Sequence, residues 1–239
     1  MQRYGLVPLF TLLLGSLSGC ASISQEECLL GDWYQIGLSD GQNGRSNRAA
    51  DYSKDCSEYQ VKMDLKSYNK GRSEGLKAYC SYDNGVSLGQ SNQRYSNVCP
   101  ADLSSEFLSG YRPYKNLASA QYEVRKSQNN IDHYQGQLMS ETISENGRKN
   151  ATANLNSAKM KLEKDEAKVR KYQQELEIHK IQREKSQILA ELSDKDISNS
   201  RREQLNKRLR SLNTQEALSD GVSTVESAIQ GIKKIADMF

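Results

Sequence analysis

Five cysteines are the residues of this 239-residue chain best suited to covalent chemistry. A cysteine can form a disulfide, ligate a metal, act as a nucleophile or carry a lipid. An odd number in an exported protein leaves one thiol outside any set of disulfides. Cys20 stands apart because it directly follows an apolar run near the amino terminus. Its role therefore decides how the other four cysteines are counted.

The segment before Cys20 has the features of an export signal. Arg3 supplies a short positive start, and residues 6–17 are largely apolar. This stretch is too short to cross a bilayer as a permanent helix, which needs roughly 20 residues. We therefore predict a signal peptide over residues 1–19.

The four residues Leu17-Ser18-Gly19-Cys20 resemble the lipobox of bacterial lipoproteins. That resemblance implies cleavage before Cys20, a diacylglycerol on its sulfur and an acyl chain such as palmitate on the new amino terminus. Ala21 after the cysteine, in place of Asp, implies the outer membrane, with the protein facing the periplasm. The membrane is thus an expected partner through the lipid on Cys20, and residues 20–27 are expected to be a lipid-anchored linker. The alternative is an ordinary signal peptide with Cys20 merely near its cleavage site.

With Cys20 lipidated, the remaining cysteines form an even set, namely Cys28, Cys56, Cys80 and Cys99. An exported protein meets an oxidising compartment, which favours two disulfides. Four cysteines allow three pairings, and the sequence does not choose among them. Zinc is the competing hypothesis, but the chain has no Cys-x-x-Cys pair and no histidine among these cysteines. We expect no metal and no other cofactor.

Catalytic signals are weak elsewhere in the chain. His133 and His179 lie in charged, helix-like segments, where a solvent-exposed imidazole is expected. Adjacent acidic pairs such as Glu26 and Glu27 belong to polar stretches without the apolar setting that acid catalysis by a carboxyl group needs. We therefore predict a noncatalytic protein. The alternative is a periplasmic ligand-binding protein or an enzyme acting on cell-wall material, with a site in the head formed by Asp32, Trp33 and Tyr34.

Charge and composition exclude further classes. Removing residues 1–19 takes away only Arg3, so 33 basic residues become 32 against 30 acidic residues. Nucleic-acid binding needs a clear basic footprint, so nucleic acid is not an expected partner. Only 7% of residues are aromatic, which argues against one large buried core.

Composition divides the chain near Pro113. The cysteines all precede it, and long Lys-, Glu-, Gln- and Leu-rich stretches without cysteine or proline follow it. We therefore predict a mainly α protein, in which a small, disulfide-stapled, Gly-rich helical head is followed by a long antiparallel helical hairpin or coiled-coil-like tail. The expected regions are a head at 28–113, a hairpin at 114–218 and an amphipathic helix at 219–239.

Glycines four residues apart recur in the head after an aromatic or apolar residue. This spacing would place both glycines on one helix face. Gly71 and Gly75 lie in a helix-like run, so we expect them to allow close helix packing. Gly41 follows Asp40 and Gly85 follows Asn84, and these pairs favour turns.

Three stretches, "CLLGDWYQIGLSDG", "YNKGRSEGLKAYCSYDNGVSLG" and "YSNVCPADLSSEFLSGY", together resemble the domain-of-unknown-function 2799 (DUF2799) family of bacterial putative lipoproteins. The resemblance covers residues 28–114 and continues more weakly beyond. It implies an envelope lipoprotein and carries no assigned activity. The chain departs from the family pattern at Asn92, where glycine is expected, and around Arg112-Pro113.

The tail carries apolar stripes at helical spacing. Leu155, Leu162, Val169 and Leu176 lie seven apart, and then the register slips to Ile178, Ile181, Ile188 and Leu192, with Asp165 interrupting the seam. Polar breaks at 144–150 and 193–200 favour antiparallel neighbouring helices, and Ser219-Asp220-Gly221 is expected to separate a last helix. The tail is expected to bind a protein partner or to mediate self-association. Whether residues 222–239 pack internally, on a partner or on a membrane stays open.

Overall fold

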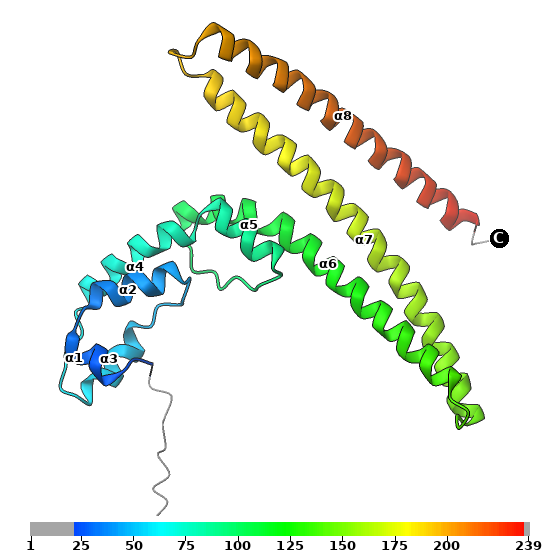
Figure 1. The fold of residues 1–239 in the computed structure, drawn as a ribbon, viewed down its shortest axis with the longest axis horizontal. Coiled ribbons are helices and arrows are strands. Elements are labelled where there is room, and N and C mark those ends of the chain that lie inside the picture. Colours follow the sequence, from blue (N-terminus) through cyan, green and yellow to red (C-terminus); the bar gives the residue numbers. More distant parts are fainter. Residues whose placement is uncertain (1–21, 237–239) are drawn as a thin grey trace, which may run out of the picture. The chain divides into compact units, whose positions relative to one another are not determined.

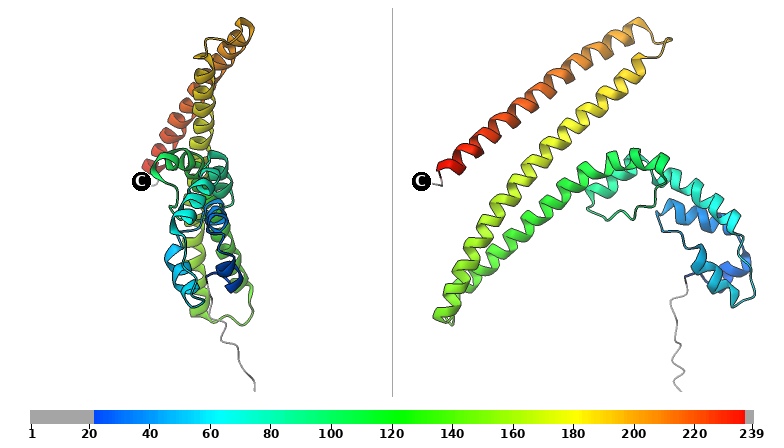
Figure 2. Two further views of the ribbon diagram at one scale, coloured as in Figure 1. Left: turned by 90° about the vertical axis from the view of Figure 1, so that its left-hand side faces the viewer. Right: turned by 180° about the vertical axis from the view of Figure 1, so that it is seen from behind.

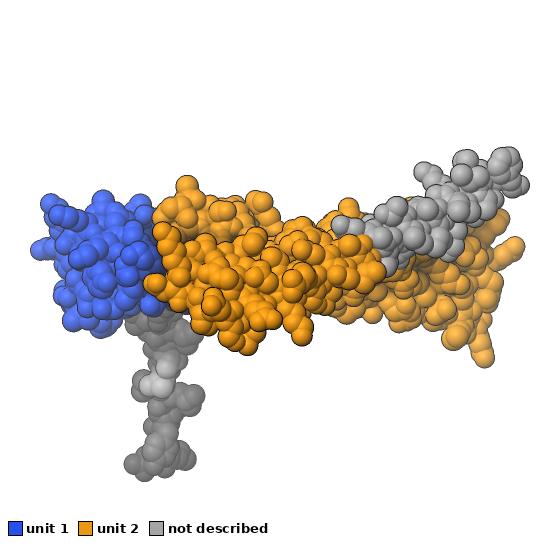
Figure 3. All heavy atoms as spheres, turned by 90° about the horizontal axis from the view of Figure 1, so that it is seen from above, with its two compact units in different colours: residues 1–79 blue, residues 80–239 orange. Residues whose placement is uncertain are grey.

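A computed structural model describes the backbone of residues 22–236 and the side chains of residues 22–219. Within this range the chain forms eight helices and no strand, which confirms the mainly α fold (Figure 1). The helices are α1 (Gln25–Leu30), α2 (Trp33–Gln42), α3 (Ala49–Ser57), α4 (Leu65–Tyr79), α5 (Tyr82–Gln90), α6 (Ala101–Met139), α7 (Glu145–Leu192) and α8 (Asn199–Ala236). They fall into two compact units, unit 1 (residues 1–79) and unit 2 (residues 80–239), coloured separately in Figure 3. The signal segment, Cys20 and the side chains of 222–239 lie outside the described residues.

The folded part of unit 1 begins earlier than the expected linker at 20–27 allows. Ile23 is only 6% exposed and packs in the hydrophobic core of unit 1. Ser24 and Glu27 then form a capping box that starts α1, and Gly31, at φ 65°, ends it in the left-handed conformation. From Ser22 onward the segment is therefore part of the head.

Glycines bring α2 and α4 into direct backbone contact. A Cβ atom at Gly71 would overlap the carbonyl oxygen of Tyr34, and one at Gly37 would overlap that of Tyr68. The same relation recurs one turn later in both helices, at Gly75 and Gly41, so the two helices run in the same direction. The expected close packing at Gly71 and Gly75 is confirmed.

A second pair of helices in unit 2 repeats this arrangement. Gly85 of α5 lies against the carbonyl of Phe107 in α6, and Gly110 of α6 lies against that of Tyr82 in α5. In each of the four helices the aromatic residue that offers its carbonyl stands three positions before the first glycine. One residue pattern thus builds two parallel helix pairs.

The turns expected at Gly41 and Gly85 are wrong, because both glycines lie inside helices and are buried. The local Asp-Gly and Asn-Gly signals are overridden by packing against a carbonyl of the partner helix. The turn after α5 comes at Asn92 instead, which adopts φ 56°. Its side-chain oxygen accepts hydrogen bonds from Lys115 and Ser119, contacts that the expected glycine could not make.

Helix α6 continues through Pro113, so the expected boundary there falls inside a helix. Proline removes the hydrogen bond to the carbonyl four residues earlier, that of Ser109. Helix α5 and the first part of α6 were expected in the head. They belong instead to unit 2, the same compact unit as the long helices.

Helices α6 and α7 form the expected antiparallel hairpin, and α8 runs back along α7 (Figures 1 and 2). Ile131 of α6 is buried with Leu155 and Ala158 of α7. Further along α7, Ile181 and Ile188 pack instead with residues of α8. The register slip seen in the sequence lies between the part of α7 that packs with Ile131 of α6 and the part that packs with α8.

The breaks around the hairpin are shorter than expected. Ser144 caps α7, so the helix already includes Asn146 and Gly147. The backbone N–H of Arg201 donates to the Ser198 side chain, so this serine caps α8. Helix α8 continues through 219–221, and the separate last helix is absent from the described backbone.

Candidate functional site

A buried carboxylate, Asp40, is the centre of the polar chemistry in unit 1. Its side chain is 1% exposed. One carboxylate oxygen accepts hydrogen bonds from the hydroxyls of Tyr52 and Tyr68, each at 2.9 Å. The other oxygen accepts from the guanidinium of Arg45 at 3.1 Å. Tyr68 also accepts from the backbone N–H of Arg48 at 3.2 Å, which fixes the connection between α2 and α4.

The ionisation of this cluster favours a structural role. Burial, and then the hydrogen bond to Asp40, raises the pKa of Tyr52 to about 12. Burial also raises the pKa of Tyr68, while the hydrogen bond to Asp40 raises that of Arg45. Both phenols therefore stay protonated donors, and the carboxylate that accepts from them is shielded from solvent. The sequence did not predict a role for Asp40, although its place three residues after Gly37 puts it on the packed face of α2.

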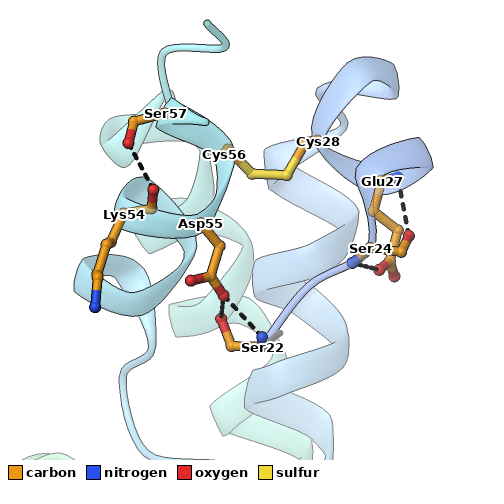
Figure 4. The surroundings of a disulfide bond; sticks show 8 residues. All are labelled: Ser22, Ser24, Glu27, Cys28, Lys54, Asp55, Cys56 and Ser57. Atoms are coloured by element: carbon orange, nitrogen blue, oxygen red, sulfur yellow. Dashed lines mark hydrogen bonds between the residues drawn. A yellow bond between two sulfur atoms is a disulfide. The ribbon is translucent and has the colours of Figure 1, made fainter. Parts of the chain in front are cut away.

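The four head cysteines form two disulfides, as expected. Cys28 pairs with Cys56 at a Cα–Cα distance of 5.4 Å, and Cys80 pairs with Cys99 at 5.7 Å. The first bond joins α1 to α3 inside unit 1 (Figure 4). The second closes a loop that leads into α6. The pairing left open by the sequence is thus between consecutive cysteines.

The three residues predicted for a ligand site, Asp32, Trp33 and Tyr34, each contribute to the structure of unit 1. Asp32 caps α2, since its carboxylate accepts the backbone N–H of Gln35 at 3.2 Å. Trp33 is 5% exposed and belongs to the core of unit 1. Tyr34 is half-buried and offers its carbonyl to Gly71. Cap, core and helix contact account for all three without a ligand.

A second buried carboxylate, Asp165, lies in the α6–α7 hairpin. It accepts hydrogen bonds from Ser127 at 2.8 Å and from Lys161 at 2.6 Å, and Lys168 lies 3.5 Å away. Burial alone would raise the pKa of Asp165, but the hydrogen bonds from Lys161 and Ser127 hold it below its usual value. The interruption of the apolar seam is therefore a satisfied polar contact between two helices.

His179 is the imidazole with the most unusual surroundings. Its ring stacks on Tyr82 at a centroid distance of 6.4 Å and lies beside the backbone of Ser109, whose helical partner is removed by Pro113. Its Nε2 atom is buried and has no hydrogen-bond partner among the described residues. Burial, followed by the charge of Arg183, lowers the pKa of His179. The expected solvent exposure holds for His133 and is wrong for His179, because α7 packs this residue against α5 and α6.

Two open grooves follow the long helices. One, with a volume of about 730 Å³, lies on α6 and α7 and is lined by Gln121, Val124, Arg125, Glu166, Val169 and Arg170. The other, of about 410 Å³, lies between α7 and α8, where Glu184 pairs with Arg208 and Glu191 with Arg201. Both mix charged and apolar side chains, as protein contact surfaces do.

Among the described residues, no cluster of three or more His, Cys, Asp or Glu side chains could hold a metal ion. Across the same part of the chain, no helix has the length and apolar character needed to cross a membrane.

A family model described as a protein of unknown function, DUF2799, matches residues 32–115. Over this segment the chain is similar to the DUF2799 family. The DUF2799 segment contains both glycine-packed helix pairs, from Asp32 at the start of α2 to Lys115, one residue beyond the contact between Gly89 and Tyr114. The two parallel pairs are therefore the structure of the family segment in this chain. No curated protein and no solved structure matches the chain.

Proposed function

We propose that this chain is a lipoprotein of the bacterial outer membrane, anchored through Cys20 and facing the periplasm, that acts without catalysis as a structural or protein-interaction module. The observation that carries the anchor is the use of the cysteines. Two disulfides take up four of the five, in a pattern typical of an oxidising compartment. Cys20, beside its lipobox-like residues, is then left for the lipid.

The interaction role is supported by the groove on the α6–α7 hairpin. Val124 and Val169 offer apolar surface there, while Arg125 and Glu166 offer both signs of charge. A mixed surface of this kind suits a protein partner or a second copy of the chain. The polar network around Asp40, by contrast, is satisfied within unit 1.

The test is photo-crosslinking in intact cells at native copy number. A photoreactive amino acid at Val124 or Val169 should give a reproducible adduct of discrete mass. The matched control is Met160, which lies on the same hairpin, is 60% exposed and does not line the groove. An adduct of twice the chain mass would identify a second copy as the partner. Equal yields from Val124 and Met160, or no adduct from either valine, would contradict the interaction role.

A further inference from the structure

The first described residue of the head is held firmly in place. The backbone N–H and the hydroxyl of Ser22 both donate to the same carboxylate oxygen of Asp55, at 2.7 and 2.6 Å (Figure 4). These hydrogen bonds lower the pKa of Asp55, which keeps its carboxylate ionised as their acceptor. Ile23, the next residue, is buried in the core. The folded head therefore starts two residues after Cys20.

This position limits the distance between the head and the lipid. An extended chain spans at most about 3.6 Å per residue, so the Cα atom of Ser22 lies within about 7 Å of that of Cys20. A linker over residues 20–27 would have allowed a separation of about 28 Å. The acylated cysteine of the proposed function sits at the membrane surface, so the head cannot stand away from it.

Helix α1, which follows at once, exposes apolar side chains. Leu29 and Leu30 are 62% and 79% exposed, whereas Cys28 on the same helix is fully buried in its disulfide. The charged residues of α1 are Glu26 and Glu27, and no basic residue accompanies them. Helix α1 therefore cannot bind anionic lipid headgroups through charge. Its contact with a bilayer would depend on its apolar side chains.

We propose that unit 1 lies directly on the phospholipid bilayer that holds the lipid of Cys20, with Leu29 and Leu30 in the headgroup region. This inference rests on the proposed anchor at Cys20 and adds the placement of the head. The short tether brings the head to the surface, and the two leucines give it an apolar contact there. The contact should be insensitive to salt and to anionic lipid.

The natural probe is Trp33, the single tryptophan of the chain. Its indole nitrogen lies 3.7 Å from the position that a Cβ atom at Gly31 would take, directly after Leu30. The acylated protein is placed in phosphatidylcholine vesicles whose lipids carry bromine close to the headgroup. Trp33 emission should fall relative to vesicles without bromine. The matched control carries a Gly/Ser insertion of about 20 residues between Ala21 and Ser22, which gives a reach of about 25 Å and should restore the emission.

A second set of variants tests the leucines. Leu29→Gln combined with Leu30→Gln should weaken the quenching, while Leu65→Gln, at another leucine of unit 1 that is 52% exposed, should leave it unchanged. Unquenched Trp33, in a sample whose mass shows an acylated Cys20, would overturn the placement and leave the anchor intact. Quenching that persists with the insertion would overturn the role of the short tether. An unacylated Cys20 would overturn the proposed function and this inference together.

Discussion

Replacing His179 with alanine should destabilise unit 2 by about 2–3 kcal/mol, and by much less when Pro113 is also replaced with alanine. Pro113 cannot donate to the carbonyl of Ser109, and the imidazole of His179 lies beside this backbone instead. Leaving a buried carbonyl unsatisfied costs about 1–3 kcal/mol. Loss of the stack on Tyr82 adds about 0.5–1 kcal/mol.

In the Pro113→Ala background, the new backbone N–H can donate to Ser109 within the helix. His179→Ala then removes the ring stack but leaves the carbonyl satisfied. The coupling free energy between the two sites should therefore be about 1–2 kcal/mol. Pro113→Ala alone should stabilise α6, since proline is unfavourable inside a helix.

The assay is urea unfolding of the mature chain with Cys20→Ser. Circular dichroism at 222 nm mainly follows the long helices of unit 2, and Trp33 emission follows unit 1 as an internal control. The two signals are fitted separately, because two units need not unfold in one step. Equal destabilisation by His179→Ala in both backgrounds, within about 0.5 kcal/mol, would refute the assigned contact.

The same contact predicts a pH dependence. Burial and Arg183 lower the pKa of His179 in the folded protein, so the unfolded chain binds more protons below the ordinary histidine pKa. The stability from neutral His179 is present above about pH 6.5 and is lost as the pH falls through the folded pKa. His179→Gln keeps an N–H donor and should remove this component.

Three further predictions concern the head and its staples. Gly71→Ala should destabilise unit 1 by about 3 kcal/mol in urea unfolding followed by Trp33 emission, because its Cβ would overlap a backbone carbonyl. Gly136→Ala, at a site with open space around it, should instead stabilise α6 by about 1 kcal/mol. A change of the same sign at both sites would be inconsistent with the helix packing. Removing the Cys80–Cys99 disulfide by paired alanine substitution should lower the stability of unit 2 by about 3 kcal/mol in urea unfolding followed by circular dichroism at 222 nm, and an unchanged midpoint would argue against this pairing. Burial and the hydrogen bond to Asp40 raise the pKa of Tyr52 from 10 to about 12, so its stabilising effect is complete below pH 10 and is lost between pH 10 and 12. Tyr52→Phe should therefore remove about 2 kcal/mol of the stability that the protein loses over this pH range. Identical stability profiles of the two proteins at alkaline pH would count against the buried cluster.

The predictable parts of the fold depend on the spacing of glycines and apolar residues along helices and on the number of cysteines. Gly71 and Gly75 share one helix face at a spacing of four, and this face packs as expected. The stripes of α7 predicted the hairpin, and their slip near Leu176 lies between the part of α7 that packs with Ile131 of α6 and the part that packs with α8. Setting Cys20 aside made the other cysteines an even set, and the disulfides confirm that set.

The parts that were missed depend on residues distant in the sequence. Gly41 and Gly85 follow residues that favour turns, and only the partner helix explains why they are helical. Nothing near His179 in the sequence indicates that its ring would meet a carbonyl freed by Pro113. Asp40 was overlooked because its two tyrosine donors come from α3 and α4. Local patterns predicted elements well and predicted the contacts between them poorly.

The measurement that tests the proposed anchor most directly is the intact mass of the protein extracted from the membranes of cells that produce it. We expect the loss of residues 1–19, the added mass of a diacylglycerol and an acyl chain on Cys20, and the loss of four hydrogens for two disulfides. A mature chain with an unmodified Cys20 would contradict the anchor, the localisation and the placement of the head on the membrane.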